Sequence, residues 1–213
     1  KRLTMSGIET PGGADQSLAR RYAIRERSLR LQKARASCAW EAASLGFNVM
    51  VLEPEMSFRS DPYPVIKAHV QDSRAATPQA ASLFLTPNAC DFSEGGKCCN
   101  PAWAGEFSQQ VFPCISTALV YAGLVGDPPG AAEVLAVLDA WRSNVDRELA
   151  QLRKDAGRWN LLERQVDRDL TAPLNWALVS AATDAPGTEI NNGEGAGGKE
   201  PMLLKGGAVL AVG

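Results

Sequence analysis

Four cysteines lie close together in the middle of the 213-residue chain and are its first candidates for chemistry. Metal sites usually take two thiolates a few residues apart on one turn, and this stretch has no C-x-x-C spacing. We expect disulfide bonds instead, because bridges would staple a Gly- and Pro-rich loop that lacks a core. Ordinary buried thiols are an equally good interpretation. The candidate disulfide cysteines are Cys90, Cys98, Cys99 and Cys114, and Cys38 stands apart.

The single histidine, His69, lies in "YPVIKAHVQ", which predicts a partly exposed residue on a short helix. A Cys–His nucleophilic pair would need a cysteine beside it, and nothing in the sequence brings one there. The chain has no G-x-S-x-G, no phosphate-binding loop and no His-Glu-x-x-His. We therefore expect no catalytic residue, no metal ligand and no intrinsic cofactor.

The stretch "AWEAASLGFNVMVLEPE" resembles the second half of the FAD/NAD-binding Rossmann fingerprint, over about 25 residues. The matching positions are Ala39, Ala42, Gly46, Val49 and Glu53. The resemblance implies that the final acid binds ribose hydroxyls. The positions of the three phosphate-loop glycines instead hold Arg30, Gln32 and Arg35. Long side chains there block the approach of a pyrophosphate, so we interpret the match as a helix–glycine–strand unit.

The residues before this unit predict a long helix from about Asp15, a suitable cap, to about Leu45. One apolar stripe is Leu18, Tyr22, Leu29, Ala36 and Trp40. A second stripe on nearly the opposite face is Ile24, Leu31 and Cys38. Two opposed stripes predict a helix packed between two neighbours. Gly46 is expected to end the helix, and "FNVMVLE" alternates as a strand does.

Between residues 20 and 35 the same helix carries seven basic residues against the single acid Glu26. They are Arg20, Arg21, Arg25, Arg27, Arg30, Lys33 and Arg35. Their charge could neutralise an acidic protein face, anionic lipid headgroups or RNA phosphates. An acidic or lipid-rimmed protein neighbour fits two apolar stripes best, and a net charge of −2 argues against bulk nucleic-acid binding. A solvated charged helix is the plain alternative.

Residues 54–126 read as an irregular Cys/Pro-rich segment, with short helices near 65–72 and 78–84. From Asp127, a plausible cap, an apolar seam recurs every seven residues to about 170. The seam residues are Leu138, Trp141, Val145, Leu152, Trp159, Leu162 and Val166. We favour one long helix over a hairpin at "KDAG". The Gly-rich tail is expected to be extended, and "AVLAV" near its end could add a strand.

The predicted fold is therefore mainly α, with long irregular segments and at most one or two short strands. It is an extended, non-compact subunit built on two long helices, about 15–45 and 128–170. The predicted regions are an arm (1–14), a basic helix plus strand (15–53), an irregular segment (54–126), a long amphipathic helix (127–172) and a Gly-rich tail (173–213). No apolar run is long enough for a transmembrane span, so the chain would be peripheral.

The favoured function is a non-catalytic accessory or linker subunit of a large organellar membrane assembly. We expect a chloroplast photosystem–antenna supercomplex, with a mitochondrial host as the alternative, and pigment or lipid contacts incidental to packing. The predicted partner-binding residues are Arg20, Arg21, Arg25, Arg27, Arg30, Arg35, Leu138, Trp141, Val145, Leu152 and Trp159. Two other functions stay open: a degenerate Rossmann-like FAD/NAD-binding oxidoreductase domain, and an organellar ribosomal or RNA-associated protein.

Overall fold

The structure is a computed structural model of the chain. It describes residues 14–54, 56–74, 82–87, 115–124, 128, 130–166, 170, 172–183, 202–203 and 209–212. The described part is mainly helical, as the sequence predicts, but it also contains a five-stranded sheet. The expectation of at most one or two strands is therefore wrong.

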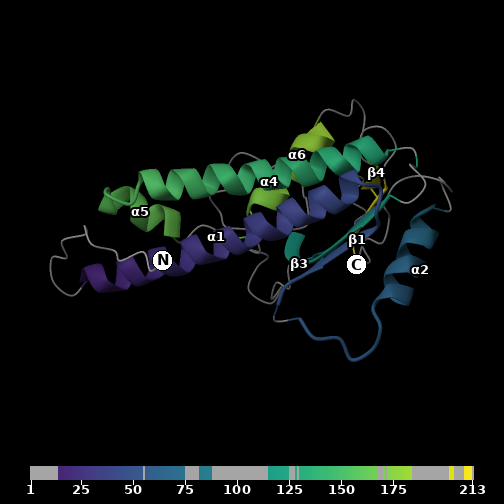
Figure 1. The fold of residues 1–213 in the computed structure, drawn as a ribbon, viewed down its shortest axis with the longest axis horizontal. Coiled ribbons are helices and arrows are strands. Elements are labelled where there is room, and N and C mark those ends of the chain that lie inside the picture. Colours follow the sequence, from purple (N-terminus) through teal and green to yellow (C-terminus); the bar gives the residue numbers. More distant parts are fainter. Residues whose placement is uncertain are drawn as a thin grey trace, which may run out of the picture.

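Two long helices form the body of the molecule. Helix α1 (Ala14–Ser44) confirms the predicted basic helix, and it packs antiparallel to α4 (Ala131–Lys154) over much of its length (Figure 1). The buried contacts include Leu29 and Ala36 from α1 and Trp141 and Val145 from α4. Helix α6 (Ala172–Thr183) adds Leu174 and Leu178 to the same core, so residues 172–183 are helical rather than an extended tail.

Helix α1 ends where the sequence predicts. Gly46 has φ 82°, in the left-handed region that glycine enters at little cost. Its N–H donates to the Ala43 carbonyl at 2.9 Å, and the Phe47 N–H donates to the Ala42 carbonyl at 3.3 Å. This pair of bonds is a Schellman motif, and it turns the chain directly into β1 (Val49–Leu52).

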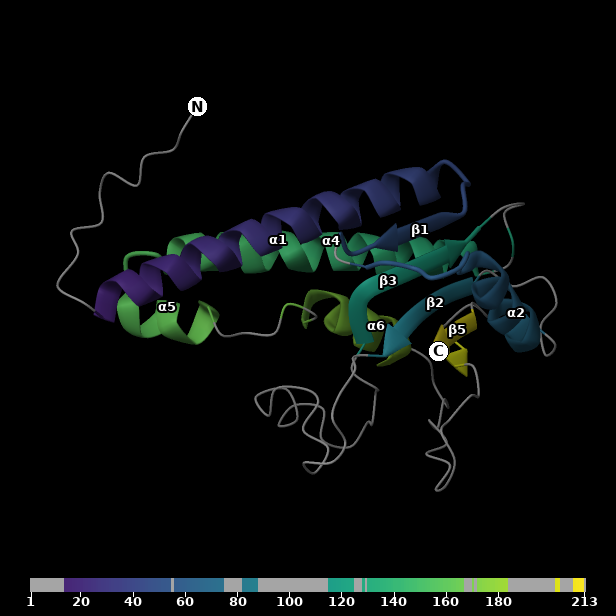
Figure 2. The same ribbon diagram turned by 90° about the horizontal axis from the view of Figure 1, so that it is seen from below.

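The predicted long C-terminal helix is broken. Helix α4 starts at Ala131, after Gly130 with φ 86°, and α5 (Trp159–Val166) follows a turn at residues 155–158. In that turn the Arg158 N–H donates to the Asp155 carbonyl at 2.8 Å. Helix α5 then lies beside the N-terminal part of α1 (Figure 2). The preference for one continuous helix was wrong, because Leu162 reaches the core through a hairpin just as well.

The sheet has the order β1-β3-β2-β5-β4. Its other strands are β2 (Ser82–Pro87), β3 (Ile115–Gly123), β4 (Met202–Leu203) and β5 (Val209–Val212). Strand β3 pairs antiparallel with β1 and β2, whereas β5 runs parallel to β2. The strand predicted from "AVLAV" is confirmed as β5. The helix predicted near 78–84 is contradicted, since Ser82–Pro87 form a strand.

The two faces of the sheet carry different helices. Leu83, Leu85 and Val120 face the core that α1, α4 and α6 share. The alternating residues Phe84, Leu119 and Tyr121 form a second, smaller cluster with Ile66 of α2 (Tyr63–Arg74), which confirms a helix at 65–72. Both central strands are therefore buried on both sides, and such strands lack the alternation by which strands are recognised in a sequence.

We expect Gly46→Ala to lower the free energy of unfolding by about 1 kcal/mol, because alanine is strained at a positive φ. No atom lies within 4 Å of the added Cβ, so a clash contributes nothing. Urea unfolding followed by circular dichroism measures the loss. Gly157→Ala is the matched control, since its Cβ also meets nothing within 4 Å and its φ is outside the left-handed region. Equal losses from the two changes would contradict this account.

Candidate functional site

The basic residues of α1 divide into an inward-facing set and an outward-facing set. Arg25 is only 4% exposed, and its Nη2 lies 3.6 Å from Oε2 of Glu148 on α4. Lys33 Nζ pairs with Asp146 Oδ1 of α4 at 2.5 Å. Arg25, a predicted partner-binding residue, is thus paired with an acid inside the chain, whereas the half-exposed Lys33–Asp146 pair lies at the edge of the α1–α4 interface.

Glu26 is the acidic centre of the same interface. Its Oε1 accepts hydrogen bonds from Arg30 at 2.7 Å and from Arg153 of α4 at 3.2 Å. Partial burial acts to raise the pKa of Glu26, but the two arginines more than offset it, and the net pKa is lowered. Glu26 is thus an internal counter-charge of the basic helix.

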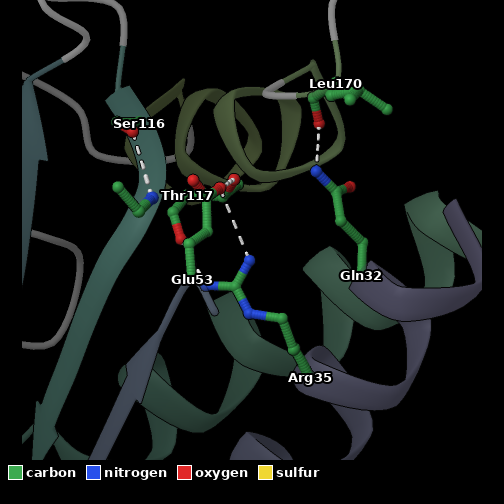
Figure 3. Close-up of polar contacts among 7 residues, drawn as sticks. Gln32, Arg35, Glu53, Ser116, Thr117 and Leu170 are labelled. Atoms are coloured by element: carbon green, nitrogen blue, oxygen red, sulfur yellow. Dashed lines mark hydrogen bonds and ion pairs between the residues drawn. The ribbon is translucent and has the colours of Figure 1, made fainter. Parts of the chain in front are cut away.

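A second cluster joins α1 to the sheet (Figure 3). Arg35 Nη2 donates to the Thr117 carbonyl of β3 at 2.5 Å, and its Nη1 lies 3.5 Å from Oε1 of Glu53. The Thr117 hydroxyl donates to the same Glu53 oxygen at 2.8 Å. Burial lowers the pKa of Arg35, and Glu53 opposes that effect. Glu53 is therefore engaged by residues of its own chain.

Arg35 and Glu53 of this cluster are also positions of the stretch that resembles the Rossmann fingerprint. Arg30, Gln32 and Arg35 stand where the phosphate-loop glycines would be, and all three lie within helix α1. The Gln32 amide donates to the Leu170 carbonyl at 2.7 Å, which ties α1 to the segment before α6 (Figure 3). Strand β1 pairs only with the antiparallel β3 among the described strands, not with a parallel neighbour. The local geometry is a helix–turn–strand without a phosphate loop.

The apolar residues predicted to bind a partner on the second long helix lie inside the chain. Leu138, Trp141 and Val145 are 0% exposed, and Leu152 is 1% exposed. They pack against α1 and α6, so they are core residues rather than an intermolecular surface. That prediction is corrected for these four positions. Trp159 lies in α5, and its side chain is outside the described residues.

The outer face of α1 is not covered by any of the described residues. Ile24 is 57% exposed, Leu31 is 47% exposed, and Cys38 is exposed. Leu45 and Phe47, just beyond the helix, are 75% and 60% exposed. The second apolar stripe of the sequence therefore has no neighbour among the described residues. We call Ile24, Leu31, Cys38 and Leu45 the outer apolar row.

The residues that the sequence singles out for disulfide or nucleophilic chemistry lie mostly outside the part of the chain that the structure describes. Cys90, Cys98, Cys99 and Cys114 lie outside the described residues, as does the side chain of His69 on α2. The described residues contain no group of three or more His, Cys, Asp or Glu that could hold a metal ion. None of the helices described is both long enough and apolar enough to cross a membrane.

The chain matches no known protein family, no curated protein and no solved structure. Its function must therefore be argued from its own residues.

The Arg35–Glu53 pair predicts an asymmetry between its two members. Glu53→Gln should cost about 2–3 kcal/mol, because it leaves a buried guanidinium without a counter-charge. Arg35→Met should cost less, about 1 kcal/mol, because Glu53 is a third exposed and keeps the Thr117 hydrogen bond. The double variant should be no less stable than Glu53→Gln alone. Urea unfolding of all four proteins tests this, and a larger loss from Arg35→Met than from Glu53→Gln would refute it.

Glu26 predicts a pH dependence of stability. Because its pKa is lowered in the folded chain, its stabilising effect is present above the ordinary carboxyl value of 4.5 and is lost as the pH falls through the lowered value. Glu26→Gln should cost about 0.5–1 kcal/mol at pH 7, and the difference from the parent should shrink towards pH 3. Glu41→Gln, on the outer side of α1, is the control. A pH-independent difference for Glu26→Gln would contradict the assignment.

Proposed function

We propose that this chain is a non-catalytic interaction subunit, which joins a larger assembly through the outer face of α1. The supporting observation is the exposed outer apolar row, in which Ile24 and Leu31 are about half exposed in the middle of a well-packed helix. Leaving such side chains in water forgoes about 1.5–3 kcal/mol of burial for each. Several exposed apolar side chains aligned along one helix face are typical of an interaction site.

The internal structure supports the same proposal. Helix α1 is held on its inner face by α4, by α5 and by the Arg35–Glu53 cluster. Its outer face is therefore presented on a rigid support rather than on a loop, which lowers the entropy cost of docking. The sequence predicts a helix between two neighbours, and α4 is one of them. The second neighbour is proposed to be another protein.

The alternative functions have less support in this geometry. A dinucleotide site would need backbone amides at residues 30–35, where α1 instead uses them in its own hydrogen bonds. An RNA-binding surface would draw on the basic residues of α1, yet Arg25, Arg30, Lys33 and Arg35 are paired within the chain. The photosystem–antenna host in a chloroplast stays a prediction, and so does the mitochondrial alternative.

The test is the size of the complex that contains the tagged chain in its source cells. The parent chain should migrate on native gels far above its own 22.7 kDa, and Leu31→Glu should shift it towards the monomer. An acid introduced there must be desolvated if the row is buried in an interface. Val65→Glu is the matched control, because Val65 is 59% exposed and lies on α2, on the opposite face of the sheet.

Two outcomes would contradict the proposed function. The first is a parent chain that migrates alone as a compact monomer. The second is a large complex that Leu31→Glu and Val65→Glu leave equally intact.

A further inference from the structure

The outer face of α1 consists of two rows with a seven-residue repeat. The first is the outer apolar row. The second lies three residues further along at each step and consists of Arg20, Arg27, Ala34 and Glu41. Every residue of this second row is exposed. Two such rows, three and four residues apart, are the a and d positions through which helices pack side by side.

The charge on this face is not balanced by the part of the chain that the structure describes. Among the described residues, Arg25, Arg30, Lys33 and Arg35 each have an acidic partner. No ion pair joins Arg20 or Arg27 to another part of the described chain, and both lie within one helical turn of Ile24. The first half of the outer face therefore combines apolar surface with two uncompensated positive charges.

A second copy of the chain fits this face poorly. If two copies of α1 packed in parallel, Arg20 and Arg27 would each meet their own counterpart, and like charges would face one another. If the copies packed antiparallel, the a-to-d layers would place Arg27 against Cys38 and Arg20 against Leu45. Both arrangements bring four arginines into the seam without enough acid, since Glu41 is the one acid of the two rows.

A lipid surface also fits poorly. Helices that lie in a membrane interface have a broad apolar face and keep charge on the other side. Here the apolar row is one residue wide, and charged positions of the second row run directly beside it. Glu41 would moreover be repelled by anionic headgroups. A partner helix fits this geometry better, because knobs-into-holes packing between two helices uses only a narrow apolar seam.

We propose that the outer face of α1 binds an acidic amphipathic helix of another protein. That helix carries apolar residues every seven positions to cover the outer apolar row. It carries Asp or Glu opposite Arg20 and Arg27, whose planar guanidinium groups can each donate two hydrogen bonds to one carboxylate. The row from Ile24 to Leu45 sets the length of the contact at about three heptads, or about 30 Å. This inference rests on the proposed function and names its partner.

The experiment uses the purified full chain and two synthetic peptides of about three heptads, which matches the length of the contact. Both peptides have the same Leu/Ile seam, and the flanking positions are Glu in one and Lys in the other. Fluorescence anisotropy of the labelled peptide measures binding at about 0.1 M salt. The Glu peptide should bind at least about tenfold more tightly than the Lys peptide, and high salt should reduce that preference.

Substitutions on the outer face of α1 test whether the peptide binds there. Leu31→Glu should abolish binding of the Glu peptide, and Val65→Glu should leave it unchanged. The double variant Arg20→Glu/Arg27→Glu should invert the preference, so that the Lys peptide binds better. Arg158→Glu, an exposed charge reversal at the start of α5, is its control and should change neither affinity.

Three outcomes overturn the inference, and they differ from those that overturn the proposed function. In the first outcome, Leu31→Glu dissociates the native complex, but Arg20→Glu/Arg27→Glu changes neither the complex nor the peptide preference. The outer face of α1 is then still the docking surface, but its partner is not an acidic helix. If the pure chain sediments as a dimer that Leu31→Glu dissociates, the occupant is a second copy. If the chain binds phosphatidylserine vesicles through Leu31 and ignores both peptides, the occupant is a membrane.

Discussion

The structure depends on burying one side of a very basic helix. Helix α1 can pack on α4 only if each inward-facing cation finds an acid or a carbonyl, because an unpaired buried charge costs several kcal/mol. Arg25 and Lys33 of α1 form ion pairs with Glu148 and Asp146 of α4, respectively. Glu26 of α1 pairs with Arg153 of α4. Of these pairs, Arg25–Glu148 holds the one buried cation and constrains the rotation of α1, while the others lie at the exposed edge of the interface. That rotation decides which apolar residues enter the core and which stay outside.

The same constraint links the helical body to the sheet. Arg35 reaches from α1 to Glu53 at the end of β1 and to the Thr117 carbonyl of β3. The Schellman turn at Gly46 brings β1 back along α1, so that Glu53 lies within reach of Arg35. The fragment that resembles a nucleotide-binding fingerprint thus performs a structural task. Its acidic residue neutralises an arginine that stands where a phosphate-loop glycine would be.

Much of this fold follows from local sequence signals, and the rest depends on contacts that are distant in the chain. Helix α1 and its end at Gly46 are predictable, because an uninterrupted run of helix formers meets a left-handed glycine. Strands β2 and β3 are not, because Leu83, Phe84 and Leu85 are buried on both sides of a central strand and show no alternation. The sequence favours one continuous helix over the hairpin between α4 and α5, because the seven-residue apolar repeat continues through the turn.

The candidate surface shows the same division. The outer stripe of Ile24, Leu31 and Cys38 is visible in the sequence as a second apolar face. The sequence cannot show that Arg25 and Lys33 pair within the chain, because their acids lie more than a hundred positions away on α4. Leu138 and Val145 belong to a regular apolar seam that could equally well contact another protein. Only the folded structure shows that this seam packs against α1 and α6.

The most direct test of the docking face is the reactivity of the Cys38 thiol, which lies between Leu31 and Leu45 on the outer apolar row. Alkylation by iodoacetamide is followed by mass spectrometry of the peptide that contains Cys38, so the other cysteines do not interfere. If the outer face is covered by a partner, Cys38 should react much more slowly in a native extract than in the isolated folded chain, where it is exposed. Equal rates in the two samples would contradict the central claim.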